Sequence, residues 1–222
     1  MDGSADDPQD PFAGQRERMV RQQIAGRGIT DAAVLAAMSQ VPREQFVLES
    51  HRPRAYDDTP LPILAGQTIS QPYIVAYMIA ALALRPGARV LEIGAGSGYA
   101  AAVLGRIAGE VYTVERHHEL VEFTRERLAR LGYNNVWVHH GDGTRGWPEH
   151  APYDGIIVAA GGPTVPESLR RQLAAGGRMV IPVGQNRHQQ NLILITRPTA
   201  DTWAEKMLAP VAFVPLIGDE GW

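Results

Sequence analysis

From residue 88 onward, short apolar runs alternate with amphipathic stretches, and this alternation constrains the fold more than any other feature of the sequence. The predicted strands are residues 88–93, 110–115, 136–140, 154–160, 178–184 and 192–197, and the predicted helices are 99–108, 117–132 and 166–173. A helix that joins two strands returns the chain to the same edge, so that the strands run parallel. The pattern therefore predicts an α/β fold: a mostly parallel, twisted sheet with helices on both faces.

The C-terminal part of the sequence changes this pattern. Residues 198–202 read PTADT, a turn-forming sequence between the strand at 192–197 and a second strand-like stretch, MLAPVAFVPL, at 207–216. Two strands joined by a short turn pair as a hairpin. We therefore expect a C-terminal hairpin that adds an antiparallel edge to the sheet.

The sequence before residue 88 is predicted to be mostly helical. Residues 15–48 carry helical apolar stripes, and Thr30 can cap a helix over 31–39. Residues 52–66 are rich in proline and are expected to be extended. A further helix is predicted over 72–84 from its apolar spacing.

The domain organisation follows from these stretches. Residues 1–14, MDGSADDPQDPFAG, are acidic and contain proline, which predicts a disordered lead-in and does not match a signal peptide. Residues 15–222 are expected to form one domain, with an N-terminal helical and loop region at 15–87 and an α/β core at 88–222.

Composition excludes several classes of function. The sequence has no cysteine, which excludes a disulfide framework, a thiolate nucleophile and a cysteine-based zinc site. The formal net charge of −3 argues against nucleic acid or an anionic membrane as the main partner. No run approaches the roughly 20 apolar residues that span a bilayer. We expect a cytoplasmic protein that acts as a monomer.

We expect no metal site. His139 and His140 precede Asp142, but adjacent residues of a strand point to opposite faces, so the two rings cannot share one ion. The charged residues Arg125, Arg127 and their neighbours are predicted to form the solvent-exposed face of the helix at 117–132.

A glycine-rich loop joins the first predicted strand of the core to its helix. Glycines stand at 94, 96 and 98 in VLEIGAGSGYA, where backbone can approach a ligand closely and the following helix presents its first N–H groups. The spacing differs from the dinucleotide fingerprint G-x-G-x-x-G. We therefore favour a different nucleotide-containing cofactor.

Three carboxylates occupy matching positions around this loop. Glu92 lies near the end of the first core strand, Glu115 ends the second, and Asp142 follows the third. Open α/β sheets bind ligands at the carboxyl ends of their strands, and an acid about 20 residues after the glycines can reach ribose hydroxyls. The alternative is that all three are ordinary loop carboxylates. Three acids at corresponding positions favour a cofactor site.

A polar run, Gln67-Thr68-Ile69-Ser70-Gln71, stands directly before the helix predicted at 72–84. Ser70 has two possible roles. Ser-Gln-Pro is a good helix-capping sequence, since serine accepts from the first N–H groups and proline is tolerated in the first turn. A ligand contact is the other possibility, because a helix N-terminus also favours a bound carboxylate.

These motifs together resemble the bacterial protein-L-isoaspartate (D-aspartate) O-methyltransferases. The matching stretches run from residue 19 to residue 216 and include MVRQQIAGRGI (19–29), VPREQFV (41–47), AYDDTPLPI (55–63), GQTISQPYIVAYM (66–78), VLEIGAGSGY (90–99), VYTVER (111–116), GDG (141–143) and VAFVPL (211–216). GQTIS is the most specific of them, since other methyltransferases share the glycine loop but lack this segment.

The resemblance implies a Rossmann-like fold and an enzyme that repairs damaged proteins. Such an enzyme transfers a methyl group from S-adenosylmethionine to the α-carboxylate of L-isoaspartyl residues and releases S-adenosylhomocysteine. The serine of the motif then lies beside the acceptor carboxylate, and Val183 helps hold the substrate peptide. The residues that this implies for the cofactor are Gln67, Thr68, Ile69, Glu92, Gly94, Ala95, Gly96, Ser97, Glu115, Arg116, Asp142 and Gly143.

A carboxylate acceptor explains why the sequence shows no convincing acid–base pair or triad. Its reference pKa is near 4, so it is ionised at neutral pH and needs no general base. Three other functions stay open at this point: methylation of a different peptide or small-molecule carboxylate, a cofactor-binding module without turnover, and a nicotinamide dehydrogenase. Damaged proteins and peptides are the expected partners if the resemblance holds.

Overall fold

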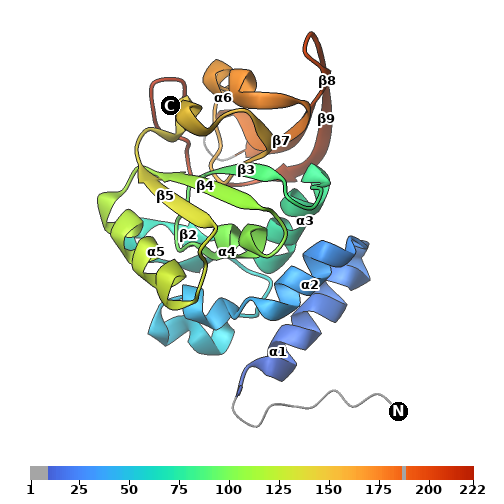
Figure 1. Cartoon of the computed structure of the whole chain (residues 1–222). Helices are drawn as coiled ribbons and strands as arrows, with labels where there is room; N and C mark the ends of the chain where they lie inside the picture. Colours follow the sequence, from blue (N-terminus) through green and yellow to red (C-terminus); the bar gives the residue numbers. More distant parts are fainter. Residues whose placement is uncertain (1–9, 187–188) are drawn as a thin grey trace.

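The computed structural model describes residues 10–186 and 189–222, and its centre is one twisted sheet (Figure 1). Within the described residues the sheet has seven strands in the order β5-β4-β3-β6-β7-β8-β9. They are β3 (Arg89–Ile93), β4 (Glu110–Glu115), β5 (Val136–His140), β6 (Tyr153–Val158), β7 (Leu173–Asn186), β8 (Gln189–Thr199) and β9 (Thr202–Val211). The strands from β5 to β7 pair in parallel, whereas β8 and β9 are antiparallel. The predicted α/β class is confirmed.

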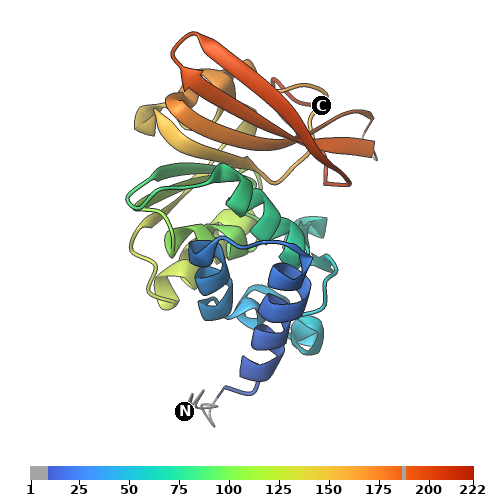
Figure 2. The ribbon, with the colours of Figure 1, turned by 90° about the vertical axis from the view of Figure 1, so that its right-hand side faces the viewer.

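Helices and short turns make up most of the remaining chain. The helices are α1 (Ala13–Arg18), continued by a π-helical turn (Met19–Ile24), α2 (Ala32–Gln40), α3 (Pro72–Leu82), α4 (Tyr99–Gly105), α5 (His118–Arg130) and α6 (Glu167–Gln172). Short 3₁₀ turns lie at Ala25–Arg27, Arg43–Phe46, Glu49–Arg54, Leu64–Gly66, Gly143–Arg145 and Pro148–His150, and β1 (Leu61–Pro62) pairs with β2 (Thr68–Ile69). The N-terminal helices all lie on one side of the sheet (Figure 2).

Two apolar cores cover the two faces of the sheet. Neighbouring residues of β3 show the division: Val90 joins the core under α2–α5, and Leu91 joins the core under α6 and the C-terminal segment. Both side chains are fully buried. Burial on both faces explains why these strands read as continuous apolar runs and not as alternating ones.

The strand order reverses between β3 and β6. The chain moves from β3 outward to β4 and β5, then returns to pair β6 with the other side of β3. Loops on either side of this point leave toward opposite faces, which opens a crevice at the carboxyl ends of the two strands. The crevice is where the fold places a ligand.

The structure corrects several predicted boundaries. The last strand is Thr202–Val211, earlier than the predicted 207–216, and residues 212–216 leave the sheet toward the crevice. The predicted lead-in is too long, because α1 begins at Ala13 and Asp10 pairs with Arg16; residues 1–9 lie outside the described part. None of the helices in residues 10–186 and 189–222 has both the length and the apolar character needed to cross a bilayer.

Candidate active site

A cavity of about 270 Å³ lies at the carboxyl ends of β3 and β6. Its walls include residues 66–70, the glycine loop after β3, residues 114–117 and the C-terminal segment 213–217. The first wall belongs to the N-terminal region and the others to the α/β core. The site is therefore assembled by packing of the whole described chain.

Twelve of the residues predicted from the sequence line this cavity: Gln67, Thr68, Ile69, Ser70, Glu92, Gly94, Ala95, Gly96, Ser97, Glu115, Arg116 and Gly143. Two predicted residues, Asp142 and Val183, are not part of its lining. The structure thus brings the GQTIS segment and the glycine loop to one space, although 20 residues or more separate them in the sequence.

The glycine loop owes its path to backbone that only glycine adopts readily. Gly94, Gly96 and Gly98 have φ values of 91°, 53° and 86°. At Gly98 a Cβ would also lie 2.8 Å from the Cγ2 of Thr124. The loop is thus held tightly against α5.

Two side chains of α5 bind the carbonyl groups of this loop. The Thr124 hydroxyl donates to the Gly96 oxygen over 2.9 Å, and the Arg127 guanidinium donates to the Ser97 oxygen over 2.9 Å. Burial lowers the pKa of Arg127 to about 10. The prediction that Arg127 belongs to a solvated face is wrong, since its side chain is buried beside Leu128.

Glu115 fixes the loop from the end of β4. One carboxylate oxygen accepts from the Gly96 N–H at 3.0 Å and the other from the His117 N–H at 2.9 Å. A carboxylate oxygen can accept more than one hydrogen bond, so both oxygens keep acceptor capacity toward the cavity that Glu115 lines. An acid at this position can shape the loop and, at the same time, bind hydroxyl groups in the cavity.

Glu92 is a buried carboxyl at the end of β3. It is 1% exposed, and its carboxyl accepts a hydrogen bond from the Thr113 hydroxyl at 2.6 Å. Burial raises its pKa to about 8, which the nearby charge of Glu115 reinforces and the Thr113 hydrogen bond opposes. This raised pKa favours the protonated carboxyl at neutral pH.

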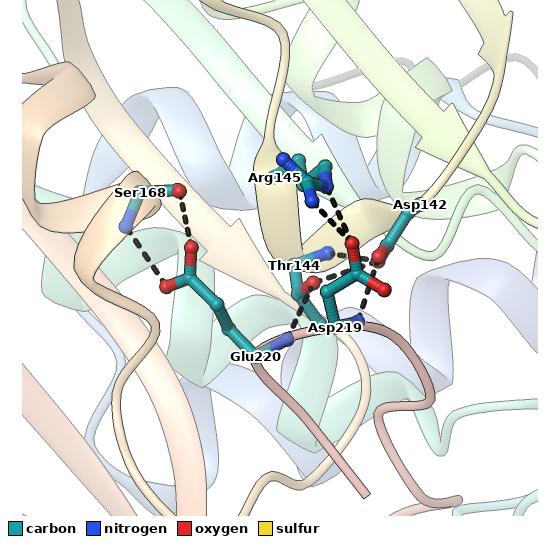
Figure 3. Close-up of polar contacts among 6 residues, drawn as sticks. All are labelled: Asp142, Thr144, Arg145, Ser168, Asp219 and Glu220. Carbon is teal, nitrogen blue, oxygen red and sulfur yellow. Dashed lines mark hydrogen bonds and ion pairs between the residues drawn. The ribbon is translucent and has the colours of Figure 1, made fainter.

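Asp142 is bound by the C-terminal segment (Figure 3). It is not among the residues that line the cavity. Its carboxylate accepts from the Thr144 N–H at 2.9 Å and from the Asp219 N–H at 2.8 Å. Burial opposes its ionisation, but these hydrogen bonds outweigh burial and keep its pKa below the usual value. Arg145 pairs with Asp219, and Glu220 binds both the N–H and the hydroxyl of Ser168.

Ser70 does not cap α3. The cap position is Gln71, and no side chain there accepts from the first turn of the helix. Within the described part of the chain the Ser70 hydroxyl has no hydrogen-bond partner, and the residue is half-buried in the lining of the cavity. Of the two roles that the sequence left open for Ser70, the structure excludes helix capping. A similar correction applies to α2, which Asp31 caps in place of Thr30.

Val183 lies one layer behind the cavity wall. It forms an isolated parallel bridge with Gly162, and Gly161 forms another with Pro215, a lining residue. A Cβ at Gly161 would lie 2.7 Å from the Gln190 side chain, so the glycine permits this close packing. The two bridges tie β7 to the C-terminal wall.

The sequence of this chain matches the model of one protein family over residues 14–221, namely protein-L-isoaspartate(D-aspartate) O-methyltransferase. The chain belongs to this family. A protein-L-isoaspartate O-methyltransferase of Rhodopseudomonas palustris is 63% identical over 95% of this chain and 86% of its own length. One from Pelobacter propionicus is 62% identical over 94% of this chain and 92% of its own length.

Solved structures agree with this assignment. A protein-L-isoaspartate O-methyltransferase superposes with a TM-score of 0.85 at 32% identity and covers 93% of this chain and 67% of its own. A Plasmodium falciparum structure described as a putative member, in complex with S-adenosyl-L-homocysteine, has a TM-score of 0.77 at 29% identity and covers 91% and 98%. The family resemblance read from the sequence is confirmed.

The cavity fits the cofactor of such methyltransferases. Positive-φ glycines bring the loop backbone to its wall, Glu115 faces it with spare acceptor capacity, and Glu92 supplies a carboxyl at its floor. Within the described ranges, no group of three or more histidine, aspartate or glutamate residues is placed to hold a metal ion. Apolar side chains of Met78, Val214 and Leu216 complete the lining.

Proposed function

We propose that this chain is an S-adenosylmethionine-dependent protein-L-isoaspartate O-methyltransferase. It transfers a methyl group to the free α-carboxylate of L-isoaspartyl residues in damaged proteins and peptides. The observation that carries this proposal is that Ser70 of the GQTIS segment lines the same cavity as the glycine loop. Family membership and relatives named for this activity support it.

The chemistry asks little of acid–base groups. S-adenosylmethionine, when bound, supplies a methyl group on a sulfonium; a carboxylate oxygen takes the methyl carbon, and the carbon–sulfur bond breaks with its electron pair going to sulfur. The acceptor is already ionised at neutral pH. The task of the protein is to align the two reactants and to exclude water.

Ser70 is the residue that we assign to the acceptor. Its hydroxyl is free of the helix, is half-buried and can donate to a carboxylate oxygen. One such donor orients the carboxylate without neutralising it. Val183, held behind the C-terminal wall, is proposed to support the substrate peptide at the same edge.

The cofactor is proposed to contact three groups of residues. The first is Gln67, Thr68 and Ile69, beside Ser70. The second is the loop Gly94, Ala95, Gly96 and Ser97 with Glu92 below it, and the third is Glu115, Arg116 and Gly143 at the ends of the neighbouring strands. Asp142 is proposed to support the cofactor site indirectly. Its carboxylate accepts from the Thr144 N–H and so shapes the turn that contains Gly143.

We also propose that residues 15–222 work as one domain and as a monomer in the cytoplasm, on damaged proteins in general and without nucleic acid. One apolar core contains residues of both the N-terminal region and the α/β region, which supports the single domain. The lack of cysteine is compatible with the cytoplasm, and the net charge of −3 is compatible with partners other than nucleic acid.

The test measures methyl transfer from labelled S-adenosylmethionine to two peptides that differ only in isoaspartate or aspartate at one position. We expect a base-labile methyl ester on the isoaspartyl peptide alone, with one S-adenosylhomocysteine formed per ester. Equal transfer to both peptides would contradict the specificity. No transfer to either, with cofactor binding intact, would overturn the assignment and indicate another acceptor.

A further inference from the structure

Arg43 is a fully buried cation next to the candidate acceptor site. Its side chain is 0% exposed and is the largest of the fully buried side chains. The Nε donates to the Ala55 oxygen over 2.7 Å, and the Nη2 donates to the Ser70 oxygen over 2.8 Å. The guanidinium carbon lies 4.7 Å from the centre of the Tyr99 ring. Arg43 therefore links the N-terminal region, Ser70 and the first residue of α4.

This arrangement is costly as a purely structural feature. Among the described residues Arg43 forms no ion pair with a carboxylate, and its Nη1 is buried without a hydrogen-bond partner. The nearby Asp58 is already paired with Arg27. A buried charge without a counter-ion is strongly disfavoured, and an apolar side chain of similar volume is often tolerated better.

Arg43 places its positive charge beside Ser70, where it can act on a bound anion. Ser70 stands between β2, which pairs with β1, and α3, which begins at Pro72. Neither element fixes the Ser70 hydroxyl, since that side chain has no hydrogen-bond partner among the described residues. The hydrogen bond from Arg43 holds the Ser70 backbone, and the positive charge behind it favours an anion at the serine.

We propose that Arg43 is a positioning residue for the acceptor carboxylate and acts through Ser70. This inference rests on the function proposed above and assigns a role to a residue outside the cavity lining. The fork of the guanidinium reaches two carbonyl groups at once, which a lysine ammonium on a single flexible stem does not reproduce. The charge and the geometry of Arg43 therefore contribute separately.

Arg127 provides a contrast inside the same molecule. It is also a buried arginine that donates to a backbone carbonyl, but its target is Ser97 of the glycine loop. If each arginine serves the segment that it holds, Arg43 variants change the acceptor side and Arg127 variants change the cofactor side. Arg125, an exposed arginine that donates to the Val138 oxygen outside the cavity, is a control for the arginine-to-lysine change itself.

The experiment compares wild type, Arg43→Lys, Arg43→Gln, Arg127→Lys and Arg125→Lys. For each protein we would measure the melting temperature, the Kd for S-adenosylhomocysteine by calorimetry, and kcat and KM for an isoaspartyl peptide. We expect Arg43→Lys to raise the peptide KM about ten-fold, the usual effect of losing one charge-assisted hydrogen bond, with the cofactor Kd within about two-fold of wild type. Arg43→Gln, which also loses the charge, is expected to raise KM further.

A second background tests whether Arg43 acts through Ser70. In Ser70→Ala, the further loss caused by Arg43→Lys is expected to shrink, because the hydroxyl that it positions is gone. Equal losses in both backgrounds would overturn the proposal. So would an unchanged peptide KM, or loss of fold and cofactor binding in both Arg43 variants, which would assign the residue to stability. A wild-type enzyme inactive on the isoaspartyl peptide would instead reject the proposed function.

Discussion

Arg127 donates a hydrogen bond to the carbonyl oxygen of Ser97 over 2.9 Å, from a helix 30 residues further along the chain. The donor is a buried cation and the acceptor belongs to the loop that lines the cavity. Ser97 lies between two glycines, Gly96 and Gly98, whose backbone would otherwise be free to move. The conformation of the loop therefore depends on α5 as well as on its own sequence.

Replacing Arg127 by lysine is expected to weaken cofactor binding about ten-fold, because the loop loses one charge-assisted hydrogen bond. Calorimetric titration with S-adenosylhomocysteine measures the effect. The peptide KM, measured at saturating cofactor, is expected to stay near the wild-type value. A Kd equal to that of wild type would show that the glycines alone hold the loop.

Replacing Ser70 by alanine is expected to lower kcat/KM for an isoaspartyl peptide about 100-fold, the usual order for a donor that orients a reacting group. Stability is expected to change by less than about 0.5 kcal/mol, because the hydroxyl does not cap α3. Urea denaturation measures the second quantity. A loss of about 1 kcal/mol, typical of a removed helix cap, would contradict this description of Ser70.

Asp31 and Thr30 give a matched pair for helix capping. The Asp31 carboxylate accepts from the N–H groups of Ala33 and Val34 at 2.9 and 3.0 Å, and Thr30 makes no such contact with α2. We expect Asp31→Ala to destabilise the protein by about 1 kcal/mol and Thr30→Ala to have little effect. Chemical denaturation of both variants checks this, and the reverse order would restore the cap predicted from the sequence.

Glu92 predicts a dependence of stability on pH. Its pKa is about 8 in the folded protein against a reference of 4.5, so between these values the folded state keeps a proton that the unfolded state has lost. Stability contributed by this group therefore falls as the pH rises from about 4.5 to 8 and then levels off. Glu92→Gln cannot titrate, so the unfolding free energy of wild type relative to this variant is expected to fall over that window. Parallel curves from pH 5 to 9 would contradict the raised pKa.

Periodicity and turn chemistry predicted the fold well where they act locally. Val90, Leu91 and Ile93 are apolar because both faces of their strand are covered, and GAGSG follows because the chain must turn there. The start of β9 was missed because Thr202–Lys206 is an exposed edge with no apolar pattern. Edge strands are defined by pairing with a neighbour, which a local sequence pattern does not show.

The candidate site was predicted where a short motif carries it. Gln67–Ser70 and Gly94–Ser97 were each visible in the sequence, and the cavity brings them together. The two buried arginines that hold these segments were not predicted from the sequence. Arg127 shares a helical face with Leu120 and Thr124, so its spacing was a usable signal that its charge concealed. Arg43 lies in a 3₁₀ turn, where no periodicity marks the buried side.

The C-terminal wall of the cavity has a consequence for the timing of synthesis. Residues 213–217 line the cavity, and residues 219 and 220 are bound to the turn at 142–145 and to Ser168. A segment synthesised about 150 residues after Gly66 therefore closes the site. Domains form as their chain emerges, N-terminal parts first. Strands β3 to β7 can assemble during translation, but the complete cavity exists only after residues 213–217 have been synthesised. A nascent chain that lacks residues 213–217 is therefore expected to be inactive.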